Sequence, residues 1–301
     1  MLKTLLPIFT NTVLPVFLVA AAGFVLAGFL AIDSRSVGRL LFYLATPALV
    51  FRSLYQMQID YTALRHLTIV AASAALLTGL LGWLISIGQE RRQRAAIVLT
   101  SAVSNNGNMG IPISLFAFGE VGVAFATIYY VVSSFISNTF GVIVASAGQT
   151  PLRVALQQSL RVPVLYAASA GFLVNAVGGR LPATLFRAVD LLADAAVPGM
   201  LILMGIQLRA APLFQAQGIV VRSVAVRLLA GPLVAWLLCT LLGVTGVERS
   251  VLILQAAMPT AVMTAVLATE YDIVPNLVAS IIFFSTLCSM ITLSFVLWMI
   301  L

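Results

Sequence analysis

Apolar residues dominate the chain in long runs that short polar or charged breaks separate. Most runs are about as long as the ~20 apolar residues that a helix needs to cross a bilayer. The pattern therefore predicts an all-α membrane protein with ten transmembrane helices. The predicted helices cover 5–30, 37–56, 65–88, 95–118, 123–147, 161–178, 184–208, 215–244, 249–269 and 275–301. A longer amphipathic connection, near 148–158, precedes the sixth of them.

The second half of the chain resembles the first half in the order of its local patterns. Pro15–Phe24 resembles Pro163–Phe172, and three further matches follow in the same order at offsets of up to 155 residues. The chain is therefore predicted to contain two five-helix copies, 1–150 and 151–301. Because five is odd, the second copy must enter the membrane from the opposite side. Such an inverted repeat is typical of secondary transporters.

The fourth predicted helix contains a polar interruption, Ser101–Ser114, which holds three Asn, two Gly and Pro112. These residue types unwind a helix, and inside a bilayer an unwound segment is tolerated only when protein or a watery cavity surrounds it. The alternative is a packing kink, although a single Pro or Gly would suffice for that. The repeat places Pro259 and Thr260 at the matching position of the ninth helix. Matched interruptions of this kind indicate a transport site.

A carboxylate suits such a pair of breaks. Each break exposes the first N–H groups of a half-helix, and the helix dipole adds partial positive charge there. Asn side chains supply neutral donors without the cost of burying a cation. Pro112 is predicted to be the first residue of the second half of the fourth helix, where its missing N–H costs nothing.

Composition excludes a soluble domain, because 61% of the residues are hydrophobic and only 8% are charged, against about 25% in soluble domains. The net charge of +7 is spread over the loops, so it does not indicate a nucleic-acid partner. If both termini lie outside, the cytoplasmic loops hold nine Lys and Arg residues and the outer side holds six. Because Lys and Arg are enriched in cytoplasmic loops, this orientation is predicted. Cys239 and Cys288 lie in apolar runs and are interpreted as packing residues.

Two other classes of protein fit the sequence less well. An intramembrane enzyme would need a catalytic group, but the chain has one His and no hydrolase or metalloprotease motif. A non-transporting receptor would have no use for a repeat with paired breaks.

The motif Asn105–Pro112, with Ala257–Ala261 in the second copy, resembles the auxin efflux carrier family over the whole chain. That family includes plant auxin exporters and bacterial carriers of malonate, malate and related anions. The resemblance implies the fold of bile acid–sodium symporters. In that fold a panel domain, about 1–60 and 160–210, flanks a core transport domain, about 61–150 and 211–301.

The resemblance also implies elevator-type movement of the core domain and a small organic anion bound where helices 4 and 9 cross, in the bacterial cytoplasmic (inner) membrane. Plant members keep an Asn near both crossings, whereas helix 9 here offers only Thr260. We therefore expect substrate binding by residues of both breaks. They are Asn105, Asn106, Gly107, Asn108, Pro112, Pro259 and Thr260.

Coupling to a proton or to sodium is left open, and no metal or other cofactor is expected. The candidate coupling residues are Ser133, Ser134, Ser137, Asn138 and Asp194. The four from helix 5 fit helix–helix hydrogen bonding equally well. No Asp or Glu lies in the helix 9 break, which argues against a tight sodium site. A sodium-coupled symporter of sterol-like or other organic anions is the alternative function.

The remaining charged residues near predicted helices have interpretations of their own. Asp190 is expected to pair with Arg187, and Arg52 is expected to extend toward the interface. Arg227 is either an anion contact or an interface residue, and His66 is interpreted as an interface residue. The expected partners are a small organic anion and the lipid bilayer, with a homodimer as a candidate assembly.

Overall fold

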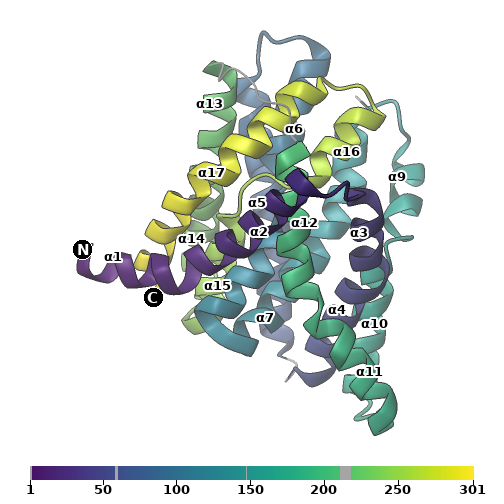
Figure 1. Cartoon of the computed structure of the whole chain (residues 1–301). Helices are drawn as coiled ribbons and strands as arrows, with labels where there is room; N and C mark the ends of the chain where they lie inside the picture. The colour runs from purple at the N-terminus through teal and green to yellow at the C-terminus, as the bar shows by residue number, and fades with distance from the viewer. Residues whose placement is uncertain (1, 58–59, 147, 211–217) are drawn as a thin grey trace.

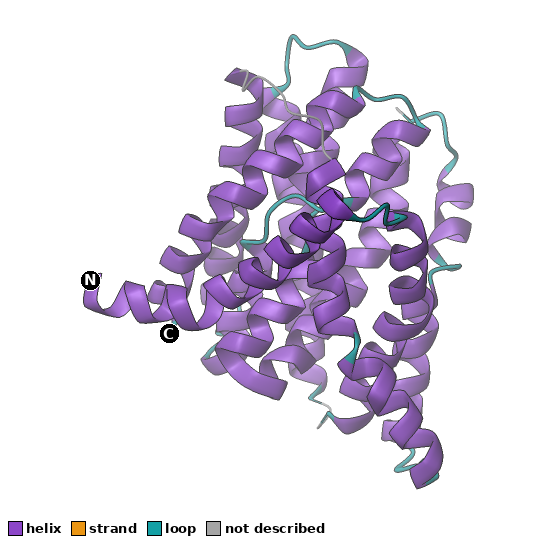
Figure 2. Ribbon diagram, viewed as in Figure 1, coloured by secondary structure: helices purple, strands orange, loops and turns teal. Residues whose placement is uncertain are grey.

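The computed structural model describes residues 2–57, 60–146, 148–210 and 218–301, and throughout these ranges the regular structure is helical. Figure 2 shows helices joined by short loops, with no strand in the described part of the chain. The prediction that the fold is all-α is therefore confirmed for the described residues. The predicted end of helix 5 at 147 and the predicted start of helix 8 at 215 lie outside the described residues.

The helical segments, with wide π-helical turns labelled η, follow in chain order. They are α1 (Leu2–Ile8), η1 (Phe9–Val13), α2 (Leu14–Phe29), α3 (Ser34–Leu40), η2 (Leu41–Ala45), α4 (Thr46–Gln56), α5 (Tyr61–Ile85), α6 (Arg91–Ala102), η3 (Asn106–Gly110), α7 (Ile111–Ile136), η4 (Ser137–Gly141), α8 (Val142–Ala145), α9 (Leu152–Ser159), α10 (Pro163–Ala176), α11 (Ala183–Asp194), α12 (Ala196–Ala210), α13 (Gly218–Ala225), η5 (Val226–Ala230), α14 (Gly231–Leu241), α15 (Gly246–Ala256), α16 (Met263–Glu270) and α17 (Pro275–Ile300).

Seven helical runs within the described residues are long and apolar enough to cross a membrane. This number is smaller than the ten predicted helices because the breaks leave α6, α15 and α16 too short to qualify alone, as is the 14-residue α10. A 40-residue run, Asn106–Ala145, also contains the second half of predicted helix 4 and all of predicted helix 5 up to residue 145. These two parts meet at Gly119, whose φ of 63° interrupts the helix between the predicted spans 95–118 and 123–147.

Four of the five wide turns in the described residues end two residues before a proline. Proline lacks the N–H of a helical residue, and its ring crowds the carbonyl group four residues earlier, so the preceding turn widens. The prolines are Pro15 after η1, Pro47 after η2, Pro112 after η3 and Pro232 after η5. The prediction that Pro112 is the first residue of its half-helix is therefore wrong, because the helix already begins at Asn106.

Close backbone approaches hold the first two membrane helices against α10 and α12. A Cβ atom on Gly23 of α2 would overlap the carbonyl group of Ile202, and one on Gly205 of α12 would overlap that of Ala20. Gly171 of α10 lies equally close to the backbone of α4. Small residues permit such approaches between membrane helices, where packing drives association.

The two ends of the chain lie close together at one edge of the molecule, where α1 contacts α17 (Figure 1). Asp33 is the N-cap of α3, and its carboxylate accepts hydrogen bonds from the Ser36 hydroxyl and from the N–H of Arg35. These bonds lower the pKa of Asp33, because they favour the charged carboxylate.

Candidate functional site

Both predicted breaks are present, and both lie in the interior of the protein. Helix α6 ends at Ala102 and the chain becomes helical again at Asn106. Helix α15 ends at Ala256, and α16 begins at Met263. Ser104 is half-buried, while Asn105 and Thr260 are buried.

The two breaks are bonded to each other as a short antiparallel bridge between Ser104 and Thr260. The N–H of Asn105 donates to the carbonyl of Pro259 at 2.8 Å, and the N–H of Ala261 donates to that of Val103 at 3.0 Å. Each break thus satisfies backbone groups of the other. Such pairing is required where water is scarce, because an unpaired backbone group costs free energy.

A side-chain network extends this contact between the two helices. The Asn106 amide donates to the backbone carbonyl of Gln255 at 2.7 Å and to its Oε1 at 3.1 Å. The Ser104 hydroxyl donates to Asn106 Oδ1 at 2.6 Å, and the Gln255 amide donates to the Ser114 hydroxyl at 3.0 Å. A Cβ atom on Gly110 would overlap the Gln255 amide, so glycine makes room for the network.

The other predicted residues of the first break have different surroundings. The Asn105 amide lies 3.8 Å from the sulfur of Met204 in α12. Gly107 packs against the ring of Tyr130, and Asn108 is half-buried. Asn105 thus reaches toward the neighbouring helix α12, whereas Asn106 is used to join the two breaks.

Thr260 is committed to structure in the second break. Its hydroxyl donates to the carbonyl of Thr100 at 2.9 Å, and its N–H donates to the Ser285 hydroxyl at 3.2 Å. Pro259 contributes its carbonyl oxygen to the bridge. The hydroxyl group of Thr260 is therefore bonded to the protein itself.

Arg227, in η5, lies next to both breaks and is 1% exposed. One guanidinium nitrogen donates to the carbonyl of Ser101 at 2.8 Å, and another donates to that of Ala256 at 2.5 Å. These carbonyls lie at the C-terminal ends of α6 and α15. None of the ion pairs among the described residues includes Arg227. The interface alternative for Arg227 is thus wrong, because the side chain is buried at the crossing.

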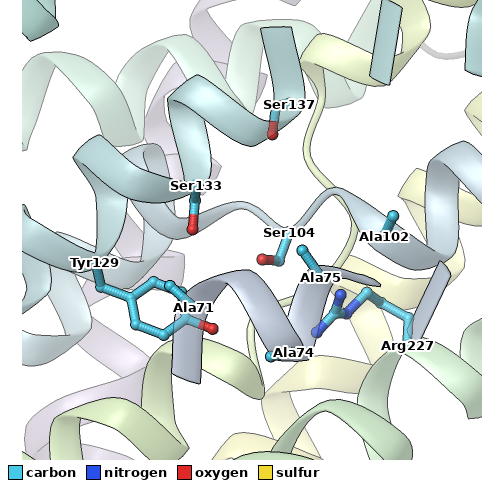
Figure 3. A pocket seen from close by; sticks show the side chains of 9 residues that line it. All are labelled: Ala71, Ala74, Ala75, Ala102, Ser104, Tyr129, Ser133, Ser137 and Arg227. Carbon is cyan, nitrogen blue, oxygen red and sulfur yellow. The ribbon is translucent and has the colours of Figure 1, made fainter. Parts of the chain in front are cut away.

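A small polar cavity adjoins the first break and contains this arginine (Figure 3). Figure 3 shows Ser104 on the connecting loop, Ser133 and Ser137 on one side of it, and Arg227 and Tyr129 at opposite ends. The lining residues are Ala71, Ala74, Ala75, Ala102, Ser104, Tyr129, Ser133, Ser137 and Arg227. The cavity therefore combines three hydroxyl groups of serine with one buried positive charge.

The four helix 5 candidates divide into two groups. Ser133 and Ser137 line the cavity, whereas Ser134 does not. The Asn138 amide donates to the carbonyl of Ser134 at 2.8 Å, within its own helix. Only the two cavity serines are therefore placed to contact a bound molecule.

Asp194 and Asp190 lie away from the breaks, on α11. Arg52 Nη1 contacts Asp190 Oδ1 at 2.8 Å and Asp194 Oδ1 at 2.6 Å. The partner of Asp190 is thus Arg52, where the sequence suggested Arg187. Arg52 thus joins α4 to α11 through two carboxylates, where the sequence suggested only that it extends toward the interface.

His66 is buried and has an acidic partner, which the interface interpretation did not foresee. Its Nδ1 lies 3.0 Å from Glu248 Oε1, so the pair joins the start of α5 to the start of α15.

Sequence reasoning missed Gln255 and did not choose a role for Arg227. Both carried a signal, since each is a polar residue inside a run of apolar residues. Polar side chains within membrane helices indicate function or bonding between helices. Arg227 is bonded to backbone carbonyls and the Gln255 side chain to Asn106 and Ser114, however, and these partners become visible only in the fold.

Broken helices that meet in the interior of a membrane protein are typical of transporters, and the comparisons with known proteins agree. The chain matches the model of the membrane transport protein family over residues 8–297. A protein of Methanothermobacter thermautotrophicus named as a transporter is 28% identical over 294 residues, which cover 94% of this chain and 96% of that protein. The "Putative malonate transporter" of Rhizobium meliloti is 26% identical over 307 residues, which cover 97% of this chain and 95% of that protein.

A plant protein resembles part of the chain. The "Probable auxin efflux carrier component 1b" of Oryza sativa subsp. japonica is 30% identical over 137 residues, covering 44% of this chain and 25% of that protein. The chain therefore belongs to the membrane transport protein family, which is the auxin efflux carrier family that the Asn-rich motif indicated. It is a membrane transporter and not an enzyme.

Proposed function

We propose that the protein is a secondary transporter that moves a small organic anion across the cytoplasmic membrane by elevator-type alternating access. The substrate would be a carboxylate such as malonate, malate or an auxin-like acid. The observation that carries this proposal is the polar cavity beside two broken helices that are bonded to each other. The name of the Rhizobium meliloti relative supports malonate as the first substrate to test.

Charge favours an anion over a cation. Arg227 brings a positive charge to the cavity, and no acidic side chain lines it. The half-helices that begin after the breaks also present N-terminal ends, where N–H groups and the helix dipole attract anions. Neither N-cap residue, Asn105 or Val262, caps its helix with a side chain. These ends can therefore attract a carboxylate.

The cavity is small in this conformation, so a carboxylate requires it to widen. The hydroxyls of Ser133 and Ser137 would then donate to the substrate, and Asn105 and Asn108 would add amide donors from the first break. The Ser104 hydroxyl already donates to Asn106 Oδ1. Hydrogen bonds to a charged group contribute about 1.5–3 kcal/mol each. A few such bonds suffice to hold a small anion with modest affinity.

Several contacts support the inverted repeat and the division into panel and core. The breaks pair in antiparallel fashion, as two copies of opposite orientation would. Helices α2 and α4 pack on α12 and α10, which fits a panel of 1–60 and 160–210 against a core of 61–150 and 211–301. Arg92 pairs with Asp272 at 2.6 Å, which fits two loops on one membrane face. We propose that this face is cytoplasmic and that both termini lie outside.

Transport by purified protein in liposomes tests the proposal. Vesicles loaded with unlabelled malonate should take up labelled malonate, and a panel of monocarboxylates and dicarboxylates would define the range of substrates. If no carboxylate of the panel is transported or stabilises the protein against heat, the proposal fails. The same assay with and without sodium, and with an imposed proton gradient, identifies the coupling ion.

Two serine variants of one helix provide a matched comparison. Ser137→Val fills part of the cavity and removes a hydroxyl group, so uptake should fall about tenfold or more, the equivalent of one bond to a charged group. Ser134→Val makes the same change outside the cavity and should leave uptake close to wild type. Equal loss in both variants would place the substrate elsewhere.

A further inference from the structure

The guanidinium group of Arg227 lies between two helix ends of the same polarity. It donates to Ser101, one residue before the end of α6, and to Ala256, the last residue of α15. The last carbonyl groups of a helix have no partner within it, and each C-terminal end carries about −0.5 of an elementary charge. The two ends together therefore present about −1 charge to one small volume.

Such carbonyl groups are ligands for a coupling cation in transporters with broken helices. A sodium ion would need several oxygen atoms from this place, and the hydroxyl group of Thr78 lies there too, 3.5 Å from Arg227 Nη1. In this chain the arginine already occupies the position. Its planar fork of donors reaches both helix ends at once, which a single metal ion would do by coordination.

The charge balance leaves no room for a second cation. Nine acidic residues are present in the chain, and none forms an ion pair with Arg227 among the described residues. The single positive charge of Arg227 thus offsets the two helix ends by itself. An added alkali ion between the same oxygen atoms would meet a like charge at close range, which is unfavourable in an interior of low dielectric.

The surrounding backbone is shaped for the guanidinium. A Cβ atom on Gly231 would overlap both Arg227 Nη2 and the carbonyl of Ala256. A Cβ atom on Gly82 of α5 would lie 2.7 Å from Ser101. Arg227 itself belongs to the wide turn η5 that precedes Pro232. Gly231 thus makes room for the guanidinium, and Gly82 lets α5 approach the end of α6 to which Arg227 is bonded.

We infer that Arg227 is a built-in cation that replaces an alkali coupling ion at the crossing, so that this site neither binds nor requires sodium. Its consequence for transport, which rests on the proposed function, is anion movement that does not depend on sodium.

Thermal unfolding of the purified wild-type protein, without substrate, tests the ion site directly. Melting temperatures in sodium chloride, potassium chloride and choline chloride at equal ionic strength should agree within about 1 °C, because a ligand stabilises only a protein that binds it. A saturable rise that is specific to sodium would overturn the inference.

Arg227 variants sharpen the test. Arg227→Gln removes the charge, so it should melt at a lower temperature in choline chloride and recover by ~5 °C or more in saturating sodium. Arg227→Lys keeps the charge without the fork and should be destabilised with no response to sodium. Arg222→Gln, an exposed change in the neighbouring α13, should behave as wild type. A folded Arg227→Gln protein that ignores sodium would contradict the inference, and if this variant does not fold, the wild-type measurement decides alone.

These measurements use no carboxylate, so their outcome is separate from that of the transport assay. A protein that ignores sodium but transports no carboxylate would refute the proposed function and leave the role of Arg227 standing. A protein that transports carboxylate and is stabilised specifically by sodium would support the proposed function and refute the inferred role of Arg227.

Discussion

The two broken helices both contribute to the bridge at the crossing, but they do so with different chemical groups. The first break is rich in side-chain donors, and its Asn106 amide forms two bonds to Gln255 of the opposite helix. The second break contributes the backbone of Pro259 and Ala261, while the Thr260 hydroxyl is bonded to Thr100. The chain therefore joins its crossing with side chains from one copy and with backbone groups from the other.

The difference shows that a polar residue in a break has two possible uses. Asn106 and Thr260 are consumed in holding the crossing together, so they are poor candidates for direct contact with substrate in this conformation. Asn105, Asn108, Ser133 and Ser137 keep donor capacity for a ligand, whereas the Ser104 hydroxyl donates to Asn106. An anion would consequently be held mainly by donors of the first break, while Arg227, whose charge offsets the two helix ends, disfavours a cation beside them.

The largest expected effect comes from Gly231, beside the end of the second broken helix. Gly231→Ala adds a methyl group against the carbonyl of Ala256 and the Arg227 guanidinium. Overpacking costs about 1–3 kcal/mol, and a rigid backbone neighbour favours the upper end. Thermal unfolding should show a marked loss, whereas Gly218→Ala, where a Cβ atom meets only the end of the Arg222 side chain, should be close to wild type. Equal stability of the two variants would show that the structure is loosely packed at the end of α15.

Asn106 and Asn105 are adjacent and separate structure from binding. Asn106→Ala leaves Gln255 Oε1 and its carbonyl without their partner, so it should cost about 1–3 kcal/mol of stability and also abolish transport. Asn105→Ala loses only a weak contact to Met204 and should keep its stability while transport falls. Melting temperatures and malonate uptake measured on both variants check this. Loss of stability in Asn105→Ala alone would reverse the assignment.

Thr260 tests whether the second break contacts substrate through a side chain. Thr260→Val keeps the shape and removes the bond to Thr100, which should cost about 1 kcal/mol. The affinity for malonate should change little, because the hydroxyl group is bonded to protein. A large rise in KM at unchanged stability would mean that Thr260 binds substrate directly.

The smallest effect is expected at Asp194. A variant there tests whether proton coupling involves a residue outside both breaks. The Asp194 side chain is 65% exposed and shares Arg52 with Asp190, so Asp194→Asn should cost less than about 1 kcal/mol. If the pair is structural, the dependence of uptake on pH should match that of wild type. A shifted pH profile would support the sequence-based prediction that Asp194 moves protons.

Hydrophobic patterning was enough to predict a helical membrane protein, because membrane spans need long apolar runs and loops carry the charges. It also located both breaks, since the concentration of Asn, Gly and Pro within Ser101–Ser114 disfavours a continuous helix. The start of the second half-helix was misplaced at Pro112, because a wide turn at Asn106–Gly110 lets the helix continue through the proline.

Partners across the fold could not be predicted from local sequence. Arg227 is more than 120 residues from Ser101, and Asn106 is 149 residues from Gln255. Only the packing of the helices decides whether a buried polar group meets a carbonyl, a carboxylate or a cavity. The division of Ser133, Ser134 and Ser137 between cavity and helix surface has the same origin, since it depends on which face of the helix packs against the cavity.

Direct binding of a carboxylate at the crossing tests the central claim. Titration of malonate into wild-type protein, followed by thermal unfolding, should give a saturable rise in melting temperature that is absent in Ser137→Val and retained in Ser134→Val. The same rise in all three proteins, or no rise in wild type with any carboxylate of the panel, would contradict a single anion site formed beside the two breaks.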